Sequence, residues 1–312
     1  MNKSAAMIGA GLIGRAWAMV FARAGWTVRL YDSHPAQLAN AGDYIAASLA
    51  EQETAGLCDA AAAAEARIEY VSSLDQAVAG AVWVHEQLPE QLALKRDVFA
   101  QLDRIARGDA ILASSTSAIP ASKFTEKLTG RARCLVAHPV NPPHLIPVVE
   151  LCGAPWTAQA TIERAHAIMT DVGQVPIVVR RELDGFILNR LQGALLTEAM
   201  RLVEEGYVSP EDLDKTIKDG LGLRWSFMGP FETIELNAPG GVADYCARYS
   251  DFYRRLAADP AHPDVWEGER AARVVGALGV PLSAAERDER TRRRDRRLLA
   301  LRQHRKASSG SE

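Results

Sequence analysis

The chain has 312 residues, of which 48% are hydrophobic and 24% charged, a composition typical of a soluble globular protein with room for two cores. Its formal net charge is −3 at pH 7, so composition gives no reason to expect a nucleic acid or an anionic membrane as a partner. No apolar stretch approaches the roughly 20 residues of a membrane-spanning helix. The four cysteines are scattered without CxxC spacing, which favours a reducing, cytoplasmic setting.

From residue 5 to about residue 180, short apolar runs alternate with longer helical segments. We predict strands over residues 5–8, 27–31, 81–85, 110–114, 134–137, 148–151 and 175–179, and helices over residues 14–24, 35–55, 92–105 and 157–172. Several strands are continuous apolar runs, as expected where helices cover both faces of a sheet. The alternation predicts an α/β fold with a Rossmann-type, doubly wound and mostly parallel sheet.

An alanine-rich stretch follows the second predicted strand and is interrupted by Gly56. We interpret residues 35–67 as a helical hairpin inserted into the sheet domain, with Gly56 at the turn between its two helices. The sheet domain is predicted to span residues 1–183.

The pattern changes after residue 182, where only helical segments follow. We predict helices over residues 186–205, 210–220, 229–237, 241–256 and 268–278, and therefore an all-helical C-terminal domain over residues 184–312. Ser209 and Pro210 have the residue types of a helix cap and a first helical position. The basic tail over residues 287–306 allows a nucleic-acid role, but its interspersed Asp288, Glu289 and Asp295 favour a solvated surface helix with a frayed end.

Residues 9–14 match the pattern G-x-G-x-x-G between an apolar strand and a helical segment. In such a turn Gly9 permits the tight bend, Gly11 lets the backbone approach a pyrophosphate, and Gly14 lets the helix pack on the strand. Leu12 and Ile13 begin the helix, where free backbone N–H groups and the positive end of the helix dipole favour phosphate. The alternative, a glycine-rich turn without a ligand, is disfavoured by this context.

Asp32 ends the second strand at the distance expected for a residue that accepts hydrogen bonds from the adenine ribose. Its charge would repel a 2′-phosphate, and Ser33-His34-Pro35 offers no arginine to bind one. NAD is therefore the predicted cofactor.

Three further segments resemble signatures of the 3-hydroxyacyl-CoA dehydrogenase family: Ser114–Ser117, His138–Pro143 and Gly185–Arg190. The resemblance covers nearly the whole chain. It is closest to the lambda-crystallin branch, which includes L-gulonate 3-dehydrogenase, through Arg201–Gly206 and Gly220–Arg224. It implies an NAD-dependent enzyme that oxidises a secondary alcohol at the 3-position of its substrate.

By this resemblance His138 exchanges a proton with the substrate hydroxyl, and Glu150 orients its imidazole. An ordinary histidine pKa near 6.5 suits a group that takes and returns a proton at neutral pH. Ser117 and Asn189 match positions that hydrogen-bond the reacting oxygen, where polar groups stabilise developing negative charge. Without the resemblance, we would interpret Ser117 as a loop cap and Asn189 as a helix-start residue. A lone histidine such as His138 would be interpreted as a structural residue.

The resemblance also places Glu90, Lys95, Asn141 and Ser117 near the nicotinamide half of NAD. An exposed charge pair at a helix start is the alternative for Glu90 and Lys95. The remaining histidines lack metal-ligand spacing, so no metal site is predicted.

The substrate is less well determined than the family. Members of the family bind CoA partly through basic and polar residues of the hairpin, whereas here the only Lys or Arg between Ser33 and Leu94 is Arg67. Arg224 lies in a stretch expected to face the cleft and can pair with a free carboxylate, although an interdomain salt bridge explains it equally well. We therefore expect a small 3-hydroxy acid, with L-gulonate first.

Three alternatives stay open: a 3-hydroxybutyryl-CoA dehydrogenase, an L-carnitine dehydrogenase, and a non-enzymatic, NADH-binding structural protein of the crystallin type. The resemblance further implies a homodimer that associates through the helical domain.

Overall fold

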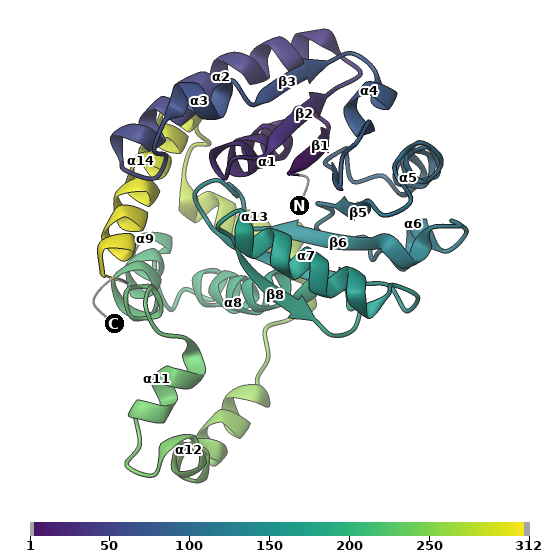
Figure 1. Ribbon diagram of the computed structural model, residues 1–312. Helices are drawn as coiled ribbons and strands as arrows, with labels where there is room; N and C mark the ends of the chain where they lie inside the picture. Colours follow the sequence, from purple (N-terminus) through teal and green to yellow (C-terminus); the bar gives the residue numbers. More distant parts are fainter. Residues whose placement is uncertain (1–2, 309–312) are drawn as a thin grey trace. The chain divides into compact units, whose positions relative to one another are not determined.

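A computed structural model describes residues 3–308 (Figure 1). The chain forms two compact units. The first contains the described residues up to Asn189 and those from Arg287 onward, and the second is Arg190–Glu286. The division expected from the sequence, after residue 183, assigns the basic tail to the helical domain, whereas the contacts group that tail with the first unit.

The first unit is built on one eight-stranded sheet, which confirms the predicted fold class. Its strands are β1 Ser4–Ile8, β2 Thr27–Tyr31, β3 Ile68–Val71, β4 Trp83–Glu86, β5 Ile111–Ser114, β6 Cys134–Pro139, β7 Val148–Gly153 and β8 Val175–Val179. They lie in the order β3-β2-β1-β4-β5-β6-β7-β8. All neighbouring pairs are parallel except β6 and β7, which are antiparallel.

Helices cover both faces of this sheet, and alternate strand residues supply two separate cores. The helices are α1 Leu12–Arg23, α2 Pro35–Thr54, α3 Ala61–Glu65, α4 Leu74–Val78, α5 Leu92–Ile105, α6 Ser122–Thr125 and α7 Gln159–Asp171. In β1, Ala5 and Met7 join the core under α1, α2 and α7, whereas Ala6 and Ile8 join the core under α4, α5 and α6. Burial on both faces explains why a central strand such as β1 is almost entirely apolar.

The predicted hairpin is present as α2 and α3, with Gly56 at a positive φ of 67° in the turn. The strand β3, which follows the hairpin directly, was not predicted from the sequence. β3 is short and lies at the sheet edge, and only its two end residues, Ile68 and Val71, are buried. A strand with so few buried residues leaves almost no periodic signal.

The basic tail forms α14 (Ala284–Ser308), which runs beside α2 and α3 in Figure 1. The expected surface helix is therefore present and largely exposed, but it is also attached to the first unit. Leu299 is buried, Arg302 donates to the His144 carbonyl oxygen at 3.1 Å, and Lys306 donates to the Gly56 carbonyl oxygen at 3.0 Å. The expected frayed end at residues 309–312 lies outside the described residues.

The second unit is helical in its described residues, as predicted. After α8 (Phe186–Glu204) come α9 Pro210–Lys215, a π-helical segment Thr216–Leu221, α10 Gly222–Trp225, α11 Pro230–Leu236, α12 Gly241–Ala257, a 3₁₀ turn Pro263–Trp266 and α13 Gly268–Leu278. Ser209 caps α9 by accepting from the Asp212 amide. Glu204 pairs with Arg270 and Arg273 and so ties α8 to α13.

Among residues 3–308, no helix is long and apolar enough to cross a membrane. The four cysteines are unpaired: Cys58, Cys134 and Cys152 are buried and Cys246 is exposed.

Candidate active site

The glycine turn between β1 and α1 has the geometry that a dinucleotide requires. Gly9 adopts a φ of 109°, and a Cβ on Gly14 would lie 1.7 Å from the Gly9 carbonyl oxygen, so neither position accepts a side chain. A Cβ on Gly11 would meet nothing within 4 Å, which leaves open space above the turn. No side chain caps the start of α1 and its first turn holds no acid, so backbone N–H groups at Leu12 and Ile13 remain available to a phosphate.

Asp32 follows β2 directly beside this turn. One carboxylate oxygen accepts from the Ala10 amide and the other from the His34 amide, each at 2.9 Å. These contacts hold the carboxylate at the carboxyl edge of the sheet, and its remaining lone pairs can accept from ribose hydroxyls. The turn and Asp32 together fit the adenosine and pyrophosphate portions of NAD.

His138 and Glu150 form a buried pair at the same edge of the sheet. They are register partners on the antiparallel strands β6 and β7, and His138 Nδ1 lies 2.8 Å from Glu150 Oε2. Their side chains are 5% and 0% exposed. Burial by itself would raise the pKa of Glu150, but the hydrogen bonds from His138 and from two backbone amides hold it below its ordinary value. An ionised Glu150 accepts the Nδ1 proton, which leaves the Nε2 lone pair free for proton transfer.

The start of α8 fastens Glu150 in place, a contact that sequence reasoning missed. Glu150 Oε1 accepts from the amides of Ile187 and Leu188 at 2.8 and 3.0 Å. Phe186, at a φ of 48°, is fully buried with its ring centroid 5.5 Å from that of His138. Free amides at a helix start stabilise a carboxylate, so the helix keeps Glu150 ionised. The Gly185–Arg190 motif was the available signal, since it places a helix start within the signature.

The structure also brings Ser117 and Asn189 together. Asn189 Nδ2 donates to the Ser117 carbonyl oxygen at 2.9 Å. Ser117 is exposed in the loop after β5, and Asn141 is exposed in the loop after β6. Ser117 and Asn141 follow β5 and β6, whose carboxyl ends lie at the edge where ligands of open α/β sheets bind, and Asn189 reaches Ser117 from the first turn of α8. Their roles remain predictions.

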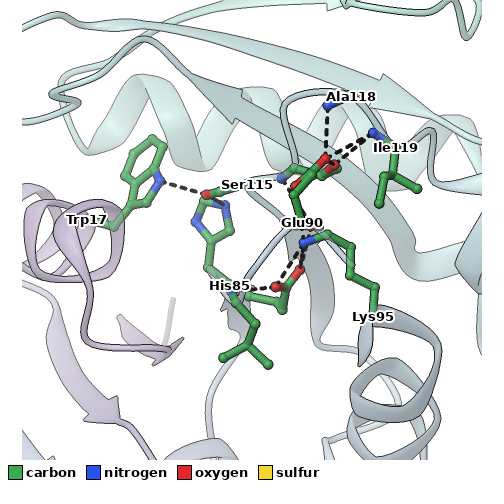
Figure 2. A network of polar contacts seen from close by, with 11 residues as sticks. Trp17, His85, Glu90, Lys95, Ser115, Ala118 and Ile119 are labelled. Carbon is green, nitrogen blue, oxygen red and sulfur yellow. Dashed lines mark hydrogen bonds and ion pairs between the residues drawn. The ribbon is translucent and has the colours of Figure 1, made fainter. Parts of the chain in front are cut away.

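Lys95 and Glu90 belong to a buried polar network at the ends of β4 and β5, seen in Figure 2. Lys95 is 1% exposed, and its Nζ lies 3.0 Å from one Glu86 oxygen and 3.7 Å from Glu90 Oε2. Glu90 and Lys95 therefore do not form the exposed charge pair that the sequence allowed as an alternative. Lys95 is buried, and its main partner is Glu86. Glu86 was missed, although an acid that ends an apolar strand is a recognisable signal for this edge.

The same network orders the loop that carries Ser117. Glu90 Oε1 accepts from the amides of Ala118 and Ile119 at 3.0 and 3.2 Å and from the Thr116 hydroxyl (Figure 2). Glu86 accepts from the Ser114 hydroxyl at 2.6 Å. Two carboxylates therefore hold both ends of the Ser114–Ile119 loop.

A second chain of contacts supports the loop from the other side. Ser115 Oγ lies 2.9 Å from His85 Nε2 and accepts from Trp17 Nε1 at 3.1 Å (Figure 2). Burial lowers the pKa of His85 to about 3, so this histidine is neutral and structural.

Arg224 lies in α10 of the second unit, where it is exposed. Among residues 3–308, no group of three or more His, Cys, Asp or Glu side chains is arranged to hold a metal ion.

Two family models cover almost the whole chain. Residues 4–183 match the NAD-binding domain of 3-hydroxyacyl-CoA dehydrogenase, and residues 185–276 match the C-terminal domain of the same enzyme. Helix α14 lies beyond both matches.

Several curated proteins are similar along most of their length. Lambda-crystallin of Oryctolagus cuniculus is 47% identical over 253 residues, which cover 80% of this chain and 79% of that protein. An L-carnitine dehydrogenase of a Pseudomonas species is 41% identical over 234 residues, covering 75% and 72%.

Solved structures show the same architecture. A 5-formyl-3-hydroxy-2-methylpyridine 4-carboxylic acid 5-dehydrogenase, described as an NAD⁺-dependent dismutase, is 29% identical, with a TM-score of 0.84 over 97% of this chain and 98% of that one. The 3-hydroxybutyryl-CoA dehydrogenase of Escherichia coli is 28% identical, with a TM-score of 0.67 over 83% of this chain and 54% of that one. With its NAD turn intact and both domains matched, the chain belongs to the 3-hydroxyacyl-CoA dehydrogenase family of NAD-dependent oxidoreductases.

Proposed function

We propose that the protein oxidises the 3-hydroxyl group of a small, free 3-hydroxy acid with NAD, and that L-gulonate is the first substrate to test. The observation that carries the catalytic part is the buried His138–Glu150 pair, with its 2.8 Å contact at the carboxyl edge of the sheet. NAD bound at this edge supplies the hydride acceptor. His138 Nε2 takes the hydroxyl proton, and Glu150 stabilises the imidazolium that forms.

Ser117 and Asn189 hold the reacting oxygen in this proposal. The Ser117 hydroxyl is exposed at the edge, and the Asn189 amide is oriented by its bond to the Ser117 carbonyl oxygen. Donors fixed in this way stabilise the negative charge that develops on the oxygen as the proton leaves.

The face of α2 supports a free acid over a CoA ester. The family resemblance assigns CoA to the hairpin, and here α14 lines a cavity of about 470 Å³ together with α1, α2 and the loop after β6. The charged lining consists of three arginines (Arg15, Arg287, Arg292) and three acids (Glu51, Asp288, Asp295). A lining with balanced charge gives little net attraction to a ligand with several phosphate charges. For a free acid, Arg224 is the proposed carboxylate partner.

The deciding assay follows NADH absorbance with L-gulonate, L-carnitine, 3-hydroxybutyrate and 3-hydroxybutyryl-CoA. Turnover of a free acid and not of the thioester supports the proposal. Turnover of the thioester alone would move the chain to the fatty-acid branch and leave Arg224 structural. L-carnitine is included because a relative named L-carnitine dehydrogenase is 41% identical.

A structural role of the crystallin kind is the second candidate, because proteins named lambda-crystallin are about 47% identical to the chain. Retention of His138, Glu150, Ser117 and Asn189 argues against a purely structural protein. NADH binding without turnover of any substrate in the panel would favour it.

We further propose that two copies associate through the helical unit. Its surface carries large apolar side chains, with Phe227, Phe231 and Leu236 each at least 70% exposed. Apolar side chains in such number on one unit favour burial against a partner. Sedimentation velocity of the wild type and of Phe231→Ser tests this, since a dimer should weaken on substitution and a monomer should not change.

A further inference from the structure

Glu86, Lys95 and Glu90 form one charge cluster, named here the edge cluster, at the carboxyl ends of β4 and β5 (Figure 2). Lys95 Nζ lies 3.0 and 3.1 Å from the two oxygens of Glu86 and 3.7 Å from Glu90 Oε2. Glu86 is fully buried, whereas the Glu90 side chain is 41% exposed. Lys95 therefore forms ion pairs with two carboxylates.

The edge cluster carries a net charge of about −1. Glu86 accepts hydrogen bonds from Lys95, the Ser114 hydroxyl and the Leu88 amide, so its carboxylate is matched by the one positive charge of Lys95. Burial would raise the pKa of Glu90, but its hydrogen bonds and the charge of Lys95 hold that pKa below its ordinary value. Across residues 3–308, no other Lys or Arg nitrogen lies within salt-bridge distance of either carboxylate.

The position of the edge cluster relates it to one half of the cofactor. In a doubly wound sheet the dinucleotide crosses the point where strand order reverses, which lies here between β1 and β4. Asp32 follows β2 on the adenosine side, so the nicotinamide half belongs on the β4–β5 side, where the edge cluster lies. The nicotinamide ring is positively charged in NAD⁺ and neutral in NADH. Uncompensated negative charge nearby therefore stabilises the oxidised form selectively.

We propose that the edge cluster biases the protein toward binding NAD⁺ rather than NADH through its net negative charge. The proposal depends on NAD binding at this edge and not on the identity of the substrate. Its test is therefore independent of the free-acid proposal. Glu86 is a positioning residue in it, since it holds Lys95 and Ser114.

The test measures dissociation constants of NAD⁺ and NADH by calorimetry without substrate, so turnover plays no part. Glu90→Gln brings the net charge to zero while its amide oxygen can still accept from Ala118 and Ile119. We expect the ratio Kd(NAD⁺)/Kd(NADH) to rise on the order of fivefold at low ionic strength and less at high salt. Lys95→Met makes the edge cluster more negative, and the ratio should fall.

Two further variants keep the test decisive if Lys95→Met does not fold. Glu86→Gln with Lys95→Met removes one charge of each sign and leaves the net charge at −1, so the ratio should stay within about twofold of the wild type. Glu163→Gln, on the exposed side of α7, removes the same charge far from the edge and should change nothing. An unchanged ratio in Glu90→Gln, or a shift of the same sign in Glu90→Gln and Lys95→Met, would overturn the proposal.

Discussion

His138 and Glu150 face each other across the antiparallel strands β6 and β7, with Nδ1 of the histidine 2.8 Å from Oε2 of the glutamate. The pair is buried, and the start of α8 donates two amides to the carboxylate. Nδ1 is thereby occupied, and in the proposed reaction Nε2 is the atom that exchanges a proton.

Glu150→Gln is expected to lower kcat roughly 100-fold while NADH binding changes little, because a neutral amide cannot stabilise the imidazolium. Steady-state kinetics and NADH binding measure both effects. Glu126→Gln, an exposed change, is the matched control. Wild-type kcat in Glu150→Gln would exclude the proposed pair.

Arg224→Met is expected to raise KM for a free 3-hydroxy acid by about 30-fold or more, since a charge-assisted bidentate contact would be lost. NADH affinity should be unchanged. Arg255→Met, an exposed arginine change in α12, is the matched control. If Arg224→Met leaves KM as it is, the arginine does not bind the substrate carboxylate.

Leu299→Ala is expected to loosen α14 from the first unit. Leu299 is the buried residue of this helix, and removing its side chain should weaken docking by about 2 kcal/mol. Because the helix is rich in arginine, trypsin should cleave it at least about tenfold faster, as followed by mass spectrometry. The same change at Leu301, which is 45% exposed, should have little effect. Equal cleavage rates in the two variants would show that Leu299 does not hold the helix.

Folding stability is expected to fall between pH 7 and pH 5. Burial lowers the pKa of both His85 and His144 to about 3, so each stays neutral in the folded state and gains a proton on unfolding below about pH 6.5. The unfolded state then binds more protons, and the free energy of unfolding decreases as pH decreases toward 3. Each histidine should contribute a loss of about 2 kcal/mol at pH 5.

Urea unfolding at the two pH values measures this loss. A variant with both His85→Gln and His144→Gln should show a flatter pH dependence than the wild type. If the two slopes are the same, these histidines are not the groups responsible.

Local patterns in the sequence determined the sheet domain, the dinucleotide turn and the hairpin. Gly9 and Gly14 are recognisable because a tight turn and a close helix–strand contact exclude side chains, and this requirement falls on neighbouring residues. The helices of the second unit follow in the same way from apolar spacing and from the Ser209 cap.

Tertiary structure alone decided which polar groups share a partner. Lys95 pairs with Glu86, Glu150 receives the amides of α8, and α14 returns to the first unit. Each of these contacts depends on where separate segments meet after folding. The spacing of residues along a chain indicates the period of a single helix or strand. The partner of a buried charge depends instead on how several elements pack together, because a charge removed from water must be compensated by the groups that surround it.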